Sequence, residues 1–117
     1  MSRVIVSKIV DCLRELSDIN YQKRVWLAST GPEISSYTEA VCQLFDDSGL
    51  GVELEKHDVI FSEDIDNKLR VLHTKLAEID DSKAPFDIIN EPKMKNIRLL
   101  SMELLKLLSQ RGQGGRP

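Results

Sequence analysis

The chain has 117 residues, of which 41% are hydrophobic and 30% are charged, and its formal net charge is −3. This size and balance are typical of one globular domain with a single core, and they argue against an extended disordered chain. The two cysteines, Cys12 and Cys42, are too few for a disulfide framework. Because both stand among apolar residues, we expect both thiols to be buried and reduced.

The beginning of the sequence lacks the pattern of a signal peptide. It contains Arg3, Lys8 and Asp11, and the longest uncharged apolar run, residues 4–6, is too short for a signal-peptide core. No stretch approaches the roughly 18 consecutive apolar residues that span a membrane. We therefore expect a cytoplasmic protein that does not enter the membrane.

The first predicted helix covers residues 3–17, with Ser2 as its cap. One apolar stripe runs along it at spacings of three and four: Ile5, Ile9, Cys12, Leu13 and Leu16. The β-branched run at residues 4–6 leaves a strand open as an alternative. A short second helix is expected over residues 18–28, with Val25, Trp26 and Leu27 facing inward, before Gly31 and Pro32 break the chain.

A capping box predicts the next helix. The Ser36 hydroxyl would accept a hydrogen bond from the backbone N–H of Glu39, and the Glu39 carboxylate would accept one from the N–H of Ser36. The helix continues through Val41, Leu44 and Phe45, and Gly49 is expected to end it. Residues 50–61 alternate apolar and acidic side chains and then become β-like, so a short hairpin is one expectation there.

The clearest helical periodicity comes next, in Ile65, Leu69, Leu72, Leu76 and Ile79. Ser62 is the expected cap, and Glu63 and Asp64 would complement the helix dipole in the first turn. A connection over residues 80–89 leads to a last helix, with Asn90 as cap and Pro92 in the first turn, that ends at about Gln110.

The last helix carries more apolar residues than one face can hold: Met94, Ile97, Leu99, Leu100, Met102, Leu104, Leu105, Leu107 and Leu108. Either this helix is central in the bundle, or its second face meets another subunit. Together the elements predict an all-α protein, a compact bundle of about four to five helices, with a short β-like segment near residues 50–61 as the open alternative. Residues 1–110 would form one helical domain and residues 111–117 a flexible tail.

No motif for catalysis or cofactor binding is found. His57 and His73 are far apart, and the sequence has no zinc or EF-hand spacing, so we expect neither a metal nor a cofactor. The glycine clusters lack the spacing of phosphate-binding loops. We therefore expect a binding protein that is not an enzyme. A small-ligand binder or enzyme around Trp26, Tyr37 and Cys42 is the weakest alternative.

Charge is distributed unevenly along the chain. Residues 33–66 contain ten acidic residues and one basic residue, a net charge of −9, whereas residues 93–117 contain six basic residues and one acidic residue, a net charge of +5. Two interpretations give the acidic segment no binding role: it folds against the basic helix, or it is merely solvated. The functional interpretation is an acidic surface that attracts a basic partner protein. Nucleic acid is disfavoured as that partner, because phosphates require a basic face.

The candidate contact surface lies within this segment. Acidic side chains would raise the association rate, and the apolar Leu54 and Phe61 would anchor the partner and supply most of the affinity. The full set of candidate partner-binding residues is Asp46, Asp47, Glu53, Leu54, Glu55, Asp58, Phe61, Glu63, Asp64 and Asp66. The alternative is a helical adaptor or self-associating subunit that forms a homodimer through residues 94–108.

Residues 35–50 (SSYTEAVCQLFDDSGL), preceded by Trp26, resemble a segment of small bacterial proteins. Some of these proteins are similar to immunity proteins of polymorphic-toxin and contact-dependent inhibition systems. The match covers about a quarter of the chain. The resemblance implies that the protein binds one cognate toxin and blocks its active site. Such toxins are often basic nucleases, which would suit the acidic segment, and the resemblance implies no catalytic residue.

Overall fold

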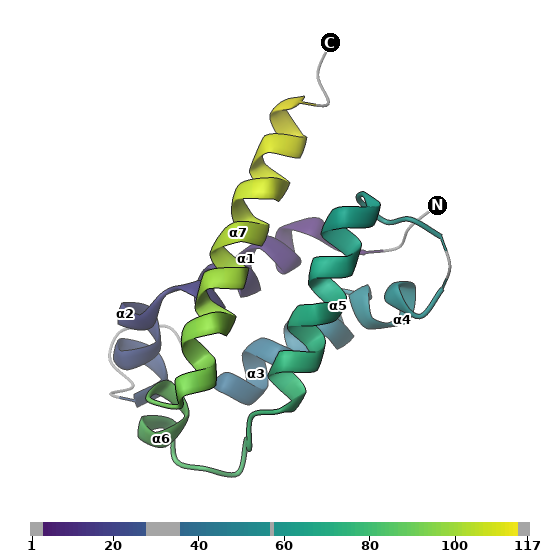
Figure 1. Ribbon diagram of the computed structural model, residues 1–117. Helices are drawn as coiled ribbons and strands as arrows, with labels where there is room; N and C mark the ends of the chain where they lie inside the picture. Colours follow the sequence, from purple (N-terminus) through teal and green to yellow (C-terminus); the bar gives the residue numbers. More distant parts are fainter. Residues whose placement is uncertain (1–3, 28–35, 57, 115–117) are drawn as a thin grey trace.

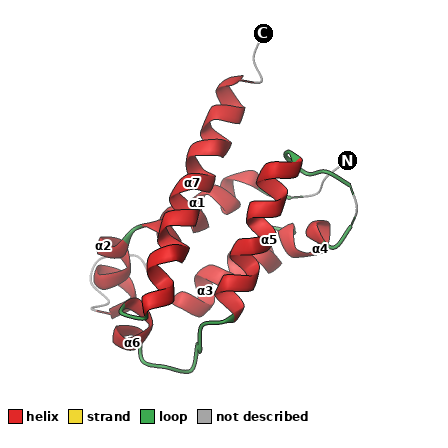
Figure 2. Cartoon of the chain, viewed as in Figure 1, coloured by secondary structure: helices red, strands yellow, loops and turns green. Residues whose placement is uncertain are grey.

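Figure 1 shows the computed structural model of the chain, which describes residues 4–27, 36–56 and 58–114, with side chains up to residue 110. Every regular element in these ranges is a helix (Figure 2), so the all-α prediction is confirmed. The expected cap Ser2, the break at Gly31 and Pro32, and His57 lie outside the described residues.

The helices follow one another with short connections. In chain order they are α1 (Val6–Ser17), α2 (Ile19–Tyr21), η1 (Gln22–Leu27), α3 (Tyr37–Cys42), η2 (Gln43–Asp47), α4 (Leu50–Leu54), α5 (Glu63–Ala77), α6 (Pro85–Ile89) and α7 (Pro92–Gly114). The segments η1 and η2 have π-helical winding and continue α2 and α3 without a break. The expected four or five helices are therefore present, together with additional short ones.

Three long helices form the frame of the bundle. Helix α7 packs against both α1 and α5, and α3 with η2 packs against α1. In Figure 1, α7 lies beside α5, and its C-terminal turns extend past the rest of the bundle. Helix α7 therefore packs against two neighbours, as the interpretation of the last helix as central requires, although its C-terminal turns extend beyond them.

Each long helix has one buried stripe of mainly apolar side chains. In α1 the buried positions are Ile9, Cys12, Leu13 and Leu16, in α5 they are Ile65, Leu69, Leu72 and Leu76 with Ile79 after the helix, and in α7 they include Met94, Ile97, Ser101 and Leu104. Spacings of three and four place each set on one side of its helix. Full burial of each large apolar side chain contributes about 1.5–3 kcal/mol.

Two serine caps are confirmed. The Ser36 hydroxyl accepts a hydrogen bond from the N–H of Glu39 at 3.1 Å, and the Ser62 hydroxyl accepts one from the N–H of Ile65 at 3.1 Å. The Glu39 carboxylate accepts a hydrogen bond from the Gln43 side chain at 2.7 Å, on the next turn of the helix.

Several predicted boundaries are wrong. Helix α1 begins at Val6, and Leu27 is exposed where it was expected to face inward. The connection over residues 80–89 contains helix α6, because Pro85 occupies its first turn, where a missing N–H costs nothing. Asn90 ends α6, and its side chain donates to the Phe86 carbonyl at 2.8 Å, so it is not the cap of α7.

The hairpin expected over residues 50–61 is also wrong within the described residues. Gly49 adopts a left-handed conformation (φ 83°) and ends η2, and the chain then turns directly into α4. The Ser48 hydroxyl accepts a hydrogen bond from the N–H of Leu50 at 3.1 Å and starts the new helix. Gly51 lets α4 approach η2, since an added Cβ there would stand 2.9 Å from the Phe45 carbonyl oxygen.

Candidate functional site

Four of the eight predicted acidic residues line a depression between the end of α4 and the first half of α5. It has a volume of about 540 Å³, and its walls include Glu55, Asp58 and Glu63. All three are exposed. Asp46, also exposed, lines a neighbouring depression together with Glu55. We call Asp46, Glu55, Asp58 and Glu63 the acidic patch.

The carboxylates of the acidic patch have no cationic partner among the described residues. The nearby lysines pair with other carboxylates: Lys56 with Glu53 at 2.9 Å, and Lys68 with Asp64 at 3.2 Å. Neither pair includes a member of the patch. The patch therefore keeps its negative charge free to act on an approaching molecule.

Two of the predicted contact residues are buried, so their placement on an exposed surface was wrong. Asp66 is 2% exposed, and its carboxylate accepts hydrogen bonds from the backbone N–H groups of Ile60 at 2.8 Å and Phe61 at 3.1 Å. Glu53 is buried on α4 and pairs with Lys56. These two hydrogen bonds fix the segment that carries Asp58, so the buried Asp66 helps to position part of the acidic patch.

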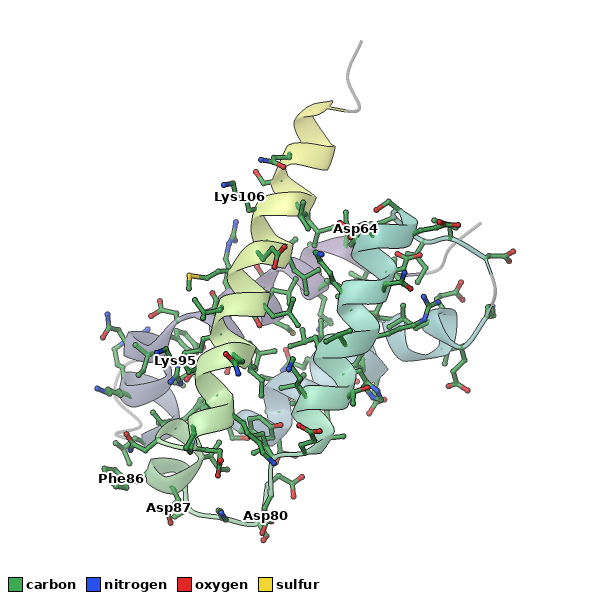
Figure 3. The ribbon with its side chains drawn as sticks, viewed as in Figure 1. Asp64, Asp80, Phe86, Asp87, Lys95 and Lys106 are labelled. Carbon is green, nitrogen blue, oxygen red and sulfur yellow. The ribbon has the colours of Figure 1, made fainter. Side chains whose placement is uncertain are left out.

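Two further predicted contact residues, Asp64 and Asp47, are exposed but lie outside the acidic patch. Asp64 stands at the start of α5 (Figure 3), and the Lys68 ammonium lies between it and Glu103 of α7, 3.2 Å and 3.6 Å from their carboxylates. The hydrogen bond to Asp64 raises the pKa of Lys68. Asp47 stands at the end of η2 and is one of the charges that act on Cys12 of α1.

The two predicted anchors do not share one surface. Leu54 is half-buried in the depression beside the acidic patch. Phe61 lines a different, more apolar groove of about 660 Å³ between α1 and the end of α7, together with Val10, Leu105 and Leu108. Two exposed apolar side chains lie next to the patch, Val59 (55% exposed) and Val52 (62% exposed), and neither was proposed as an anchor from the sequence.

Two basic residues, Lys56 and Arg70, line the depression, and Arg70 belongs to α5. Its guanidinium donates to the Leu54 carbonyl at 3.1 Å and 3.3 Å and to the Asn67 side chain at 3.1 Å. These bonds hold the end of α4 against α5. Arg70 is half-buried, and its guanidinium donates to neutral oxygen atoms of the protein. The carboxylates of the patch remain exposed.

The basic helix does not neutralise the acidic patch. Among the described residues, no ion pair joins a member of the patch to a basic residue of α7. Arg98 instead donates to the buried Gln22 side chain at 3.1 Å and to the Ile89 carbonyl at 3.3 Å. Burial lowers the pKa of Arg98. Lys95 and Lys106 project from the side of α7 that faces away from α5 (Figure 3).

The alternative set Trp26, Tyr37 and Cys42 is not assembled around one cavity. Trp26 and Tyr37 are buried and pack edge to face, with ring centroids 6.0 Å apart. The Trp26 indole donates to the Glu15 carboxylate at 2.6 Å, and the Tyr37 hydroxyl donates to the Leu76 carbonyl at 2.6 Å. Burial raises the pKa of Tyr37 above its usual range.

The expectation for Cys42 was wrong, because its side chain is exposed, whereas Cys12 is buried as expected. Burial raises the pKa of the Cys12 thiol to about 11. Cys42 and Tyr37 line a shallow depression of about 400 Å³ that Trp26 does not reach. Within the part of the chain that the structure describes, no cluster of three or more metal-ligating side chains occurs.

No helix in the described ranges has the length and hydrophobicity required to cross a membrane. No protein-family model, curated protein or solved structure matches this chain.

Proposed function

We propose that this chain is a non-enzymatic binding module that recognises a basic partner protein through its acidic patch. In the most specific form of the proposal, it is a cytoplasmic immunity-type or antitoxin-type inhibitor that covers a basic toxin. The observation that carries the proposal is the patch itself: four exposed carboxylates on η2, on α5 and on the connection between α4 and α5, with no ion-pair partner among the described residues.

Charge and shape support the proposal together. Unpaired exposed carboxylates raise the local negative potential and accelerate the encounter with a positively charged protein. Val59 offers an exposed apolar side chain within the same depression, and the half-buried Leu54 also lines it. An interface with a polar rim and an apolar centre is the common arrangement for specific protein partners.

A second candidate function is self-association through α7. Leu99 and Met102 are large apolar side chains that remain about half exposed on this helix. Lys95 and Lys106 lie at helical spacing on either side of them, so the four form one outer face. A Leu99→Gln variant should shift the sedimentation profile toward monomer at high concentration. If the wild-type protein and the Leu99→Gln variant both sediment as monomers at high concentration, this candidate function is removed.

The acidic patch is tested by paired affinity capture from native lysate at low salt, with quantitative mass spectrometry. The baits are the wild-type protein, a Glu55→Lys/Asp58→Lys variant, and an Asp11→Lys/Asp87→Lys control that changes the net charge equally on other exposed helix positions. The proposal predicts a basic protein that the wild type and the control retain and the patch variant loses. Equal retention by all three baits would refute it.

A further inference from the structure

Three depressions lie in a row on one side of the molecule, each sharing at least one lining residue with the next, and we call this row the groove. The depression at the acidic patch (about 540 Å³) shares Leu54, Glu55 and Arg70 with the next one (about 420 Å³). That second depression shares His73 with the third one (about 400 Å³), which also contains Cys42. The groove therefore extends well beyond the acidic patch.

One face of α5 forms a wall along the whole groove. Its lining residues recur at spacings of four and three: Glu63, Asn67, Arg70, Thr74 and Ala77. The opposite wall is made by α4, η2 and α3 in turn. Glu63 and Ala77 are 14 positions apart on α5, and a helix rises 1.5 Å per residue, so the wall that they delimit is about 21 Å long.

Both ends of the groove carry acidic side chains, and each of its three depressions also contains apolar ones. Apolar side chains occur along its length, with Leu54 and Val59 in the first depression, Val52 in the second and Val41 in the third. Val52 is 62% exposed, the largest exposed fraction among the large hydrophobic residues that the structure describes. The acidic patch surrounds one end and the middle.

The far end of the groove carries a second pair of carboxylates, Asp80 and Asp81. Hydrogen bonds from Ser82 lower the pKa of Asp80. In all, seven acidic side chains and two basic ones, Lys56 and Arg70, line the three depressions. A ligand that fills the groove therefore meets negative charge along its whole length.

The walls of the groove select among the ways a polypeptide can be recognised. Addition of a strand requires an exposed sheet edge, and the described part of the chain has no strand. A polyproline ligand requires exposed aromatic slots, whereas the Tyr37 and Phe45 rings that line this groove are buried in the core. Helix-lined grooves with an apolar floor accept an amphipathic helix, with one anchor per turn.

From this geometry we infer that the groove seats a single amphipathic helix of a partner protein, about four turns long, with apolar side chains on one face and lysine or arginine on both flanks. This inference rests on the proposed function, because it names the partner element that the acidic patch would attract. Charge complementarity at both ends orients the helix along α5, and the apolar side chains spaced along the groove, such as Val52 and Val59, receive its apolar face.

The test measures the affinity of a synthetic probe by fluorescence anisotropy. The probe is an end-capped peptide of about four helical turns with leucine at every third or fourth position and lysine on both flanks. A control peptide has the same composition, with the leucines distributed around the helix. The protein variants are Ala77→Arg in the third depression, Val52→Arg in the second, and Val71→Arg, a control on an exposed position of α5 outside the groove.

The inference predicts that Ala77→Arg and Val52→Arg each weaken binding of the amphipathic probe about tenfold, and that Val71→Arg changes it less than about twofold. The composition-matched peptide should bind about tenfold more weakly than the probe. Helicity measured by circular dichroism should be equal for all three variants, since each substitution is at an exposed position.

Other outcomes overturn the inference in distinguishable ways. If Glu55→Lys/Asp58→Lys weakens the probe but Ala77→Arg and Val52→Arg behave like Val71→Arg, the acidic patch binds cations and the groove does not seat a helix. If no variant changes binding, both the groove and the acidic patch fail. If the protein dimerises and Ala77→Arg dissociates the dimer, the occupant is the basic outer face of α7 from a second copy, and a partner helix is excluded.

Discussion

Substitution of Asp66 should destabilise the fold far more than substitution of any exposed acidic residue. Its carboxylate is 2% exposed and binds the N–H groups of Ile60 and Phe61 at 2.8 Å and 3.1 Å. Hydrogen bonds to a charged acceptor contribute about 1.5–3 kcal/mol each, and unsatisfied buried donors carry an additional cost. An Asp66→Ala variant should therefore lose about 3–5 kcal/mol of unfolding free energy.

The assay is urea unfolding followed by circular dichroism, combined with hydrogen exchange of the two amides. The urea midpoint of the variant should fall, whereas the slope of unfolding free energy against urea should stay unchanged. In the variant, the Ile60 and Phe61 amides should exchange faster than the amides of α1. The matched control is Asp64→Ala, two positions earlier in the same helix, where the carboxylate is exposed and pairs with Lys68. Its loss should be much smaller than that of Asp66→Ala, because exposed ion pairs contribute little.

A loss below about 0.5 kcal/mol for Asp66→Ala, within the range of ordinary surface substitutions, would refute this account. It would mean that the Asp66 carboxylate does not hold the segment before α5. The shape of the acidic patch would then need another origin, because Asp58 and Val59 lie directly before the two residues that Asp66 binds.

Three further predictions concern other parts of the fold. Gly51→Ala should destabilise the protein by about 1–3 kcal/mol in thermal unfolding, although alanine is the better helix former, because its Cβ would stand 2.9 Å from the Phe45 carbonyl oxygen. Ser101→Ala should raise the unfolding free energy by about 0.5–1 kcal/mol in urea titrations, since the fully buried Ser101 hydroxyl has no partner among the described residues. Burial, aided by the charge of Glu15, raises the pKa of Cys12 from 9.0 to about 11, so the unfolded chain releases this proton first and stability should fall as the pH rises through that window; a Cys12→Ala variant should show a shallower fall in pH-dependent unfolding, and an equal slope would contradict the assignment.

The sequence predicted the elements whose formation depends on local patterns. The stripes of α1 and α5, the caps Ser36 and Ser62, and the end of η2 at Gly49 follow from side-chain periodicity and from hydrogen bonds within a few residues. These features are set by residues close in the chain, and a single sequence contains all of them.

The failures arose where tertiary contacts decide the outcome. Apolar and acidic residues alternate at positions 52–55, which suggested a strand. In the structure, however, the buried residues are Leu50 and Glu53, and this spacing of three is helical. Cys42 was expected to be buried, yet Tyr37, Ala40 and Leu44 form the buried face at spacings of three and four, and Cys42 falls opposite Ala40 and Leu44.

The candidate site was predicted in part. The unpaired charge of Glu55, Asp58 and Glu63 follows from composition, because the segment has almost no basic residues. The burial of Asp66 could not be inferred, since its partners are backbone amides brought close by a turn of the chain. The groove along α5 is likewise a tertiary feature, because α3, η2 and α4 supply its second wall.

The most direct test of the acidic patch is the association rate of a captured basic partner as a function of salt concentration. The wild-type protein should associate fast at low ionic strength, with a rate that falls steeply as salt is added. The Glu55→Lys/Asp58→Lys variant should associate at least about tenfold more slowly at low salt and show a shallower salt dependence. Equal association rates for the two proteins at low salt would contradict the proposal that the acidic patch steers the partner.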